Sequence, residues 1–219
     1  MGFTELWSTY GENYIAALLT TWGMTLVCFA LVMVLAVAVT VLRVSPFKPL
    51  RWVGDLYVQI FRNIPGVSLL IIVVYALPYL NIVLDYLPSV IVAVVLVASA
   101  FGSENFMSGI NTIGVGQIEA ARSLGMSFGK ILRQIVIPQA LRSTVLPMTN
   151  LFIAVMLTTA LGSQVPLDTP ELTGVVSYIN TRSTGGILAF AISALGYALT
   201  ALAIGFAGSR LDRKVRVLR

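Results

Sequence analysis

Five apolar segments, four of them close to membrane length on their own, constrain this chain more than any other feature. A helix needs about 20 predominantly apolar residues to cross the hydrocarbon core of a bilayer. Charged residues make up only 11% of the chain, whereas about 25% is usual for soluble proteins. The sequence therefore predicts an all-α integral membrane protein that forms one domain over residues 1–219. Its five spans are expected at about 22–43, 56–80, 88–107, 144–162 and 187–208.

The second of these spans is the least regular. Its apolar run, residues 67–80, is too short to cross a membrane alone. It reaches membrane length only if a helix begins near residue 56 and continues through the proline at position 65. Such an interruption either marks a transport site or only shapes packing. Arg62, Asn63 and Pro65 are therefore candidate pathway residues, with both interpretations open.

The lysines and arginines predict the orientation of the spans. If the spans number five, thirteen of the fourteen bases fall on one side of the membrane, and only Arg182 falls on the other. Cytoplasmic loops carry such an excess of Lys and Arg. We therefore expect the N-terminus outside the cell and the C-terminus in the cytoplasm. The net charge of +5 follows from this topology and indicates no nucleic-acid partner.

Cysteine and histidine usage excludes several kinds of site. The chain has one cysteine, Cys28, in an apolar run, and no histidine. An intrachain disulfide is impossible, and we expect Cys28 to be a small buried or lipid-facing hydrophobe. The phosphate-binding pattern G-x-x-x-x-G-K-[ST] does not occur. The sequence therefore predicts no metal, no cofactor and no ATP hydrolysis by this chain itself.

A charged, helix-forming segment interrupts the apolar sequence at residues 113–140. Residues 119–124 favour a short helix, and Gly125 stands where a residue in the left-handed conformation would end it. Ser127 can then cap a second helix, which Pro138 is expected to break. The pattern has two interpretations, a docking element on the basic side and an amphipathic helix that lies on the membrane. The apolar face of the second helix would consist of Phe128, Ile131, Leu132 and Ile135.

The same segment resembles the EAA motif of ABC importer permeases. The leading Gly116-Gln117 and the pair Leu124-Gly125 are similar to the polar amino-acid subfamily, the histidine and glutamine permease type. Residues 61–65 resemble the RGTP segment of that subfamily, and the likeness extends over roughly residues 15–215. Ile137 replaces the more usual leucine. The anchors that match are Glu119, Ala120, Ala121, Gly125, Ile135 and Pro138.

The resemblance implies a type I ABC importer fold and a division of labour between subunits. The cytoplasmic EAA loop would form coupling helices that fit a groove on a dimer of ABC ATPases. An extracellular or periplasmic solute-binding protein would deliver the substrate, and a second permease subunit, identical or related, would complete the pathway. The chain would then be a non-catalytic permease in the plasma membrane of a prokaryote. Its substrate would be a polar amino acid, with glutamate favoured by a general likeness to glutamate permeases.

Polar residues in the spans leave alternatives open. Glu104 matches the subfamily pattern Glu-x-x-Arg-Gly, although Met107 replaces the arginine. Glu104 serves the transport pathway, or else it lies at the interface or bonds the EAA loop. At the end of the fourth span, the hydroxyls either line a polar path or bond nearby backbone. The candidate residues there are Thr158, Thr159, Ser163 and Gln164.

The remaining alternatives concern the outer loop and the function itself. Three roles are open for residues 163–185: a gate, a docking surface for the binding protein, or a simple connector. The alternative function is a small secondary amino-acid carrier or channel. Such a carrier would couple to ions through intramembrane carboxylates, and the spans contain almost none away from their ends.

Overall fold

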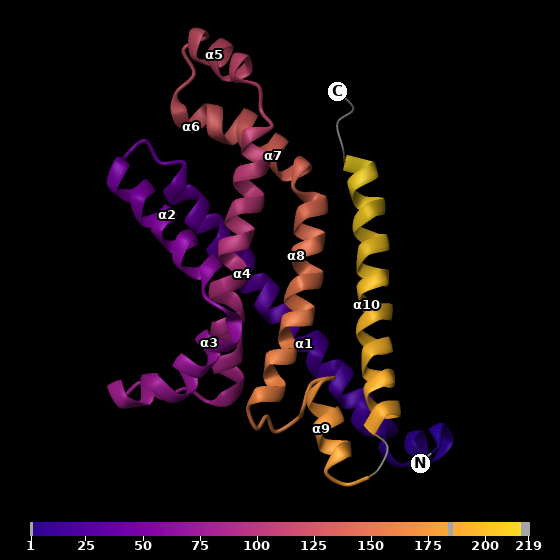
Figure 1. Ribbon diagram of the computed structural model, residues 1–219. Coiled ribbons are helices and arrows are strands. Elements are labelled where there is room, and N and C mark those ends of the chain that lie inside the picture. The colour runs from indigo at the N-terminus through magenta and orange to yellow at the C-terminus, as the bar shows by residue number, and fades with distance from the viewer. Residues whose placement is uncertain (1, 184–185, 216–219) are drawn as a thin grey trace.

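The computed structural model describes residues 2–183 and 186–215, and all regular structure in these ranges is helical (Figure 1). Within them, four helical stretches are long and apolar enough to cross a membrane, and a bent pair raises the number to five. The predicted all-helical membrane protein is therefore confirmed. The four stretches are α1 (Phe3–Arg43), α4 (Tyr86–Asn111), α8 with the 3-10 helix η4 (Val145–Thr158 and Thr159–Gln164) and α10 (Gly186–Val215).

Helix α1 begins well before the predicted span. The apolar run predicts a start near residue 22, but the helix starts at Phe3 and is 41 residues long. Its early turns bury Leu6, Tyr14 and Ala17 against α9 (Gly174–Asn180) and α10. Tertiary packing, rather than apolar composition, therefore stabilises this extension of the helix.

The interruption expected at residues 62–65 is a complete break, so no single helix passes from residue 56 to residue 80. Helix α2 (Lys48–Asn63) and the helical stretch from Gly66 to Leu80 meet at an angle of 101°. Ile64, between them, has φ −89° and ψ 126°. Proline disfavours the helical conformation in the residue before it, so Pro65 ends α2. The second span is therefore a bent pair of helices.

The stretch after the bend changes its helical type twice. It consists of α3 (Gly66–Ile71), the π-helix η1 (Ile72–Ala76) and the 3-10 helix η2 (Leu77–Leu80). Asn81 ends it with φ +61°, a left-handed conformation that asparagine tolerates better than most residues. In Figure 1 this stretch projects away from the other helices.

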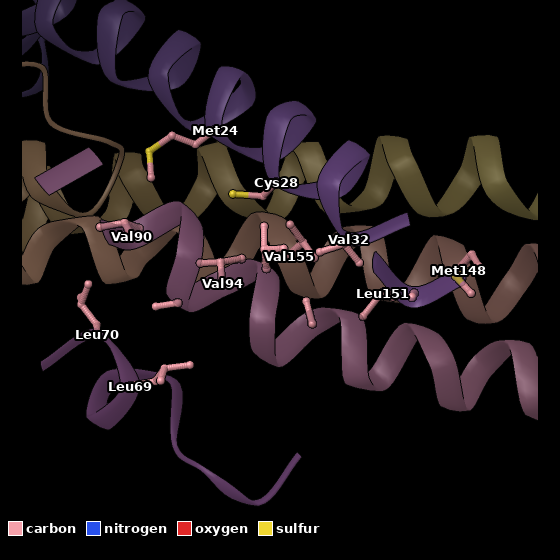
Figure 2. Packing of buried hydrophobic residues seen from close by; sticks show 14 of the residues in the cluster. Met24, Cys28, Val32, Leu69, Leu70, Val90, Val94, Met148, Leu151 and Val155 are labelled. Atoms are coloured by element: carbon pink, nitrogen blue, oxygen red, sulfur yellow. The ribbon is translucent and has the colours of Figure 1, made fainter. Parts of the chain in front are cut away.

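Helix α4 lies at the centre of the core. It packs along α1, and an added Cβ at Gly102 would lie only 2.8 Å from the Cβ of Ala36. Cys28 is fully buried here, so of its two predicted environments, buried and lipid-facing, the structure shows the buried one. Figure 2 shows side chains from α1, α3, α4 and α8 meeting in one apolar cluster, among them Met24, Cys28, Val32, Leu69, Leu70, Val90, Val94, Met148, Leu151 and Val155.

Helix α10 packs against α8 at a point where no side chain fits. An added Cβ at Gly208 would overlap the side chain of Thr149, whereas one at Gly205 would meet only Ile153 Cδ1, at 3.8 Å. We expect Gly208→Ala to lower the free energy of unfolding by about 1–3 kcal/mol relative to Gly205→Ala, because overpacking forces the helices apart. Thermal unfolding of both purified variants in detergent measures the difference. Equal stability of the two would contradict this packing.

The helices of the bundle end at two opposite faces (Figure 1). The loop end carries α5 (Val115–Ser123), α6 (Phe128–Ile131) and the last turns of α10. The far end carries α9 and the first turns of α1. Helices α1 and α10 therefore start at the far end, and α10 finishes at the loop end, as an odd number of spans requires.

Candidate functional site

The loop that was predicted from residues 113–140 projects from the bundle as two short helices (Figure 1). Gly125 ends the first of them with φ +74°, which confirms the predicted left-handed residue. The amide of Met126 donates to the carbonyl of Ala121 (3.1 Å), and the amide of Gly125 donates to the carbonyl of Arg122 (2.9 Å). These two bonds form the helix-ending motif that needs a residue with positive φ. The sharp corner between the helices therefore depends on Gly125.

The second helix differs from the prediction in two details. Ser127 occupies the cap position in an extended conformation, but its side chain makes no capping bond. The predicted break at Pro138 is wrong, because the helix continues through the π-helix η3 (Leu132–Val136) into α7 (Ile137–Ser143). Pro138 lies where the π-helix passes into α7, and prolines and π-bulges are usual sites of irregularity within a helix. The root of the loop is therefore one continuous helical stretch of changing type that leads toward α8.

One hydrogen bond and a buried apolar cluster hold the loop to the helical stretch at its root. Gln139 Nε2 donates to Gln117 Oε1 across the loop at 2.8 Å. Of the motif anchors, Ala121 is buried and Ile135 is half-buried, whereas the others lie on the surface. Phe128 is exposed and does not join the apolar face predicted for it. The buried cluster consists of Ile113, Ala121, Ile131, Val136 and Ala140.

The corner presents an exposed apolar side chain beside open space. Leu124 is 82% exposed, and no atom lies within 4 Å of the position that a Cβ on Gly125 would take. Glu119 and Ala120 are also exposed. A single exposed leucine is ordinary on a protein surface, so the open space around Gly125 is the more specific feature of this corner. The outward side of the loop is therefore available to a partner, and the inward side fixes its shape.

Four charged residues from three helices form a charge cluster. Arg43 Nε lies 2.9 Å from Asp55 Oδ1, and Arg43 Nη2 lies 2.9 Å from Glu104 Oε1. Arg62 Nη1 lies 3.6 Å from the same glutamate oxygen. Glu104 thus pairs with α1 and α2, rather than with the EAA loop as one of its predicted roles required. The cluster joins the end of α1 to the middle of α2 and to α4.

The members of the charge cluster differ in how far they are exposed. The Arg43 side chain is 12% exposed, whereas Glu104 and Arg62 are 36% and 42% exposed. The Arg62 guanidinium also lies 5.4 Å from the centre of the Phe101 ring. Charged groups within membrane spans face a protein interior or a water-filled cavity rather than lipid. The faces of α2 and α4 that carry Arg62 and Glu104 are therefore unsuited to contact with hydrocarbon.

Most of the other predicted pathway residues form hydrogen bonds with residues close to them in the sequence. Thr158 donates to the Ala154 carbonyl at 2.7 Å, and the fully buried Thr159 donates to the Met156 carbonyl at 2.6 Å. Such bonds to the same helix are the second interpretation given above. These residues lie toward the far end and so do not join the charge cluster. Ser163, Gln164 and Asn63 likewise bond close neighbours in sequence, while Pro65 forms the bend.

Glu171 was not singled out by the sequence, although the structure buries it completely. Its carboxylate accepts hydrogen bonds from the amides of Thr173 (2.6 Å) and Gly174 (2.7 Å) and from the Tyr197 hydroxyl (2.7 Å). The sequence signal is weak, an acidic residue just before a short helix. Its partner Tyr197 lies 26 residues further along the chain, and no local pattern connects the two.

One protein family matches most of this chain. Residues 33–217 fit the family described as the inner membrane component of binding-protein-dependent transport systems. The chain belongs to this family. It is a multi-pass membrane permease of the ABC importer type, and it is a non-catalytic subunit, because partner ATPases hydrolyse the ATP in such systems. The resemblance carried by the EAA segment is thus confirmed.

Curated relatives and solved structures agree with this assignment. The glutamate transport system permease protein GluC of Corynebacterium efficiens is 31% identical, with 98% of this chain and 99% of GluC covered. The L-cystine transport system permease protein TcyB of Bacillus subtilis is 34% identical over 78% of this chain and 72% of TcyB. A crystal structure of an amino acid ABC transporter with histidines has a TM-score of 0.91 at 23% identity, covering 98% and 99% of the two chains.

Proposed function

We propose that this permease imports an amino acid and that its preferred substrate is an acidic one such as glutamate. GluC proteins of two Corynebacterium species, which are glutamate permeases by name, each align with 98% of this chain. The charge cluster offers a half-exposed carboxylate and a half-exposed guanidinium. These two groups complement the ammonium and carboxylate groups that every free amino acid carries. The alternative, a small secondary carrier or channel, has no support from the family match.

The projecting loop carries the main argument for ATP-driven import. Gly125 creates a rigid corner, and Leu124 and Glu119 are exposed on it. This shape suits insertion into a groove on a cytoplasmic ATPase dimer. The residues that we assign to coupling are Glu119, Ala120, Ala121, Gly125, Ile135 and Pro138. The exposed ones would contact the ATPase, while Ala121 and Ile135 would hold the loop in shape.

The complete importer would contain more chains. The half-exposed charges need a water-filled space, and one chain of five spans encloses little of it, so a second permease subunit would complete the pathway. Arg62 and Glu104 would line this pathway at the bend that Asn63 and Pro65 create. Toward the far end, Thr158, Thr159, Ser163 and Gln164 would shape the gate, mainly through their backbone bonds. A solute-binding protein would deliver substrate at that end.

The proposed orientation gives a direct prediction. On a Cys28→Ser background, an impermeant thiol reagent should label Asn180→Cys in intact cells and should not label Lys130→Cys. Both positions are exposed, but they lie at opposite ends of the bundle, and the excess of bases places the loop end in the cytoplasm. Lys130→Cys should react after the cells are opened, which serves as its control. Labelling of Lys130→Cys from outside would contradict the orientation.

The proposed substrate is tested by transport. The chain is co-expressed with a candidate ATPase, a second permease and a binding protein, and the purified complex is reconstituted into vesicles. Uptake of labelled glutamate should be inhibited more strongly by unlabelled glutamate or aspartate than by glutamine, cystine or arginine. Stronger inhibition by a neutral or basic amino acid would contradict the acidic preference. Failure of the chain to retain any ATPase would contradict the importer itself.

A further inference from the structure

Two sets of hydrogen bonds and one apolar contact attach the far-end segment, residues 165–180, to the bundle. The amide of Leu172 donates to the Thr21 hydroxyl of α1 at 3.1 Å. Glu171 links the start of α9 to Tyr197 of α10 through the three bonds described above. Beneath α9, apolar side chains pack against α1 and α10, with Leu172, Val175, Val176 and Ile179 buried there.

Glu171 is an unusual choice for this place. Among the described residues, the ion pairs involve other carboxylates, so its charge is balanced by hydrogen bonds alone. A buried carboxylate without a cation is costly unless polar donors satisfy it. It is also packed tightly, since an added Cβ at Gly162 would lie 3.0 Å from Glu171 Cγ. A side chain that only filled space would be apolar, so the carboxylate itself has a role.

The chemistry of a carboxylate explains that role. Two oxygens can accept the two amides at the start of α9 and the phenol of Tyr197 at the same time. A glutamine offers one oxygen, and its NH2 group would face a donor. Hydrogen bonds to a charged acceptor are also about twice as strong as neutral ones. Glu171 therefore joins α9 to α10 more firmly than an uncharged residue of the same size could.

We propose that Glu171 is a positioning residue that makes α9 a rigid part of the bundle, so that contact at the far end moves α10 and α1 together. The outer side of α9 exposes Tyr178, and the Arg182 guanidinium stacks on its ring at 3.8 Å. A protein that docks on this surface can transmit its binding to the spans only if α9 is firmly attached. This transmission rests on the proposed delivery of substrate by a binding protein at the far end.

The attachment is tested by thiol labelling, which requires no transport. On a Cys28→Ser background, Ile179→Cys should react slowly because Ile179 is fully buried, and the exposed Ser177→Cys should react rapidly. Adding Glu171→Ala should accelerate labelling of Ile179→Cys by about tenfold or more, because opening of α9 then breaks fewer charged hydrogen bonds. Glu171→Gln should give an intermediate rate. An unchanged rate in Glu171→Ala would overturn the proposal.

Two controls keep this result specific. Thr173→Ala removes only a hydroxyl that lies 3.3 Å from the Tyr197 hydroxyl, longer than an ordinary O–H···O bond. It leaves the three donors to Glu171 in place, so it should alter the rate less than about twofold. In Glu171→Ala with the native cysteine, Cys28 should stay unreactive, because it lies in the separate core cluster. Reaction of Cys28 at the same accelerated rate would show general unfolding and overturn a local role for Glu171.

The second readout is stimulated ATP hydrolysis by the assembled complex. Glu171→Ala should keep basal hydrolysis and lose most of the stimulation by loaded binding protein, while Thr173→Ala should keep both. Normal stimulation in Glu171→Ala would overturn the transmission role. If the wild-type complex shows no stimulation, the proposed delivery by a binding protein fails, whereas the labelling rates still decide whether Glu171 attaches α9.

Discussion

Gly125→Val should reduce substrate-stimulated ATP hydrolysis by the assembled importer more than tenfold. Gly125 has φ +74°, a conformation that costs a non-glycine residue about 1–2 kcal/mol. A β-branched residue is less tolerant still. The two bonds that end α5 would be lost, and the exposed corner would change its shape. Because this corner lies outside the spans, the variant should still insert into the membrane at normal levels.

Matched variants separate backbone conformation from added bulk. Gly116→Val introduces the same side chain in the same loop, at an ordinary φ and in open space, and should have a much smaller effect. Gly125→Asn adds a side chain but tolerates the left-handed conformation. It should therefore retain more activity than Gly125→Val. Glu119→Lys reverses the charge on the outward side of the loop and should also weaken ATPase binding.

The measurement combines co-purification with kinetics. Each tagged variant is purified from membranes, and the amount of retained ATPase and its stimulated turnover are compared with wild type. If the loop were only a surface helix, Gly125→Val and Glu119→Lys would both retain normal amounts and normal turnover. That outcome would contradict the assignment of residues 113–140 as the coupling element.

Arg43→Gln should destabilise the protein strongly, whereas Arg62→Gln should mainly impair transport. Arg43 is nearly buried and contacts both carboxylates of the charge cluster at 2.9 Å. Removing Arg43 should cost about 1.5–3 kcal/mol, the range for hydrogen bonds to charged groups, because the carboxylates left behind are 50% and 36% exposed and stay partly solvated. Arg62 is half-exposed and more distant from Glu104, and exposed pairs contribute only about 0–1 kcal/mol.

The comparison is made in two assays. Thermal unfolding in detergent should show a large loss for Arg43→Gln and a small one for Arg62→Gln. The double variant Arg43→Gln, Glu104→Gln should recover part of the loss, because the unpaired carboxylate of Glu104 is then neutral. Vesicle uptake should fall sharply for Arg62→Gln despite its stability. Normal uptake by Arg62→Gln would exclude Arg62 from the pathway.

The sequence predicted features that depend on local chemistry. Apolar runs of the right length predicted α4, α8 and α10, because a membrane span is defined by composition and length. Gly125 was predicted to be left-handed because a helix end followed by glycine has few other conformations. The EAA spacing identified the family because its anchors are fixed within one loop.

Features that depend on distant contacts were missed. Helix α1 extends to Phe3 because Leu6 and Tyr14 pack against α9 and α10, and the sequence of α1 alone carries no sign of that contact. The interruption at Pro65 was predicted from the proline, but the 101° angle between the two helices was not, because it depends on how each of them packs. The bonds from Glu171 to Tyr197 and from Arg43 to Glu104 join residues of different helices. Their pairing follows from the fold.

The central claim is that ATP hydrolysis, transmitted through the loop at residues 113–140, drives amino-acid import by this permease. Uptake into vesicles that contain the complete complex, with ATP supplied and an uncoupler added to collapse the proton gradient, tests it most directly. The account predicts that uptake requires ATP, persists with the uncoupler and disappears when the permease carries Gly125→Val. Loss of uptake on adding the uncoupler, while ATP remains intact, would contradict it and favour a secondary carrier.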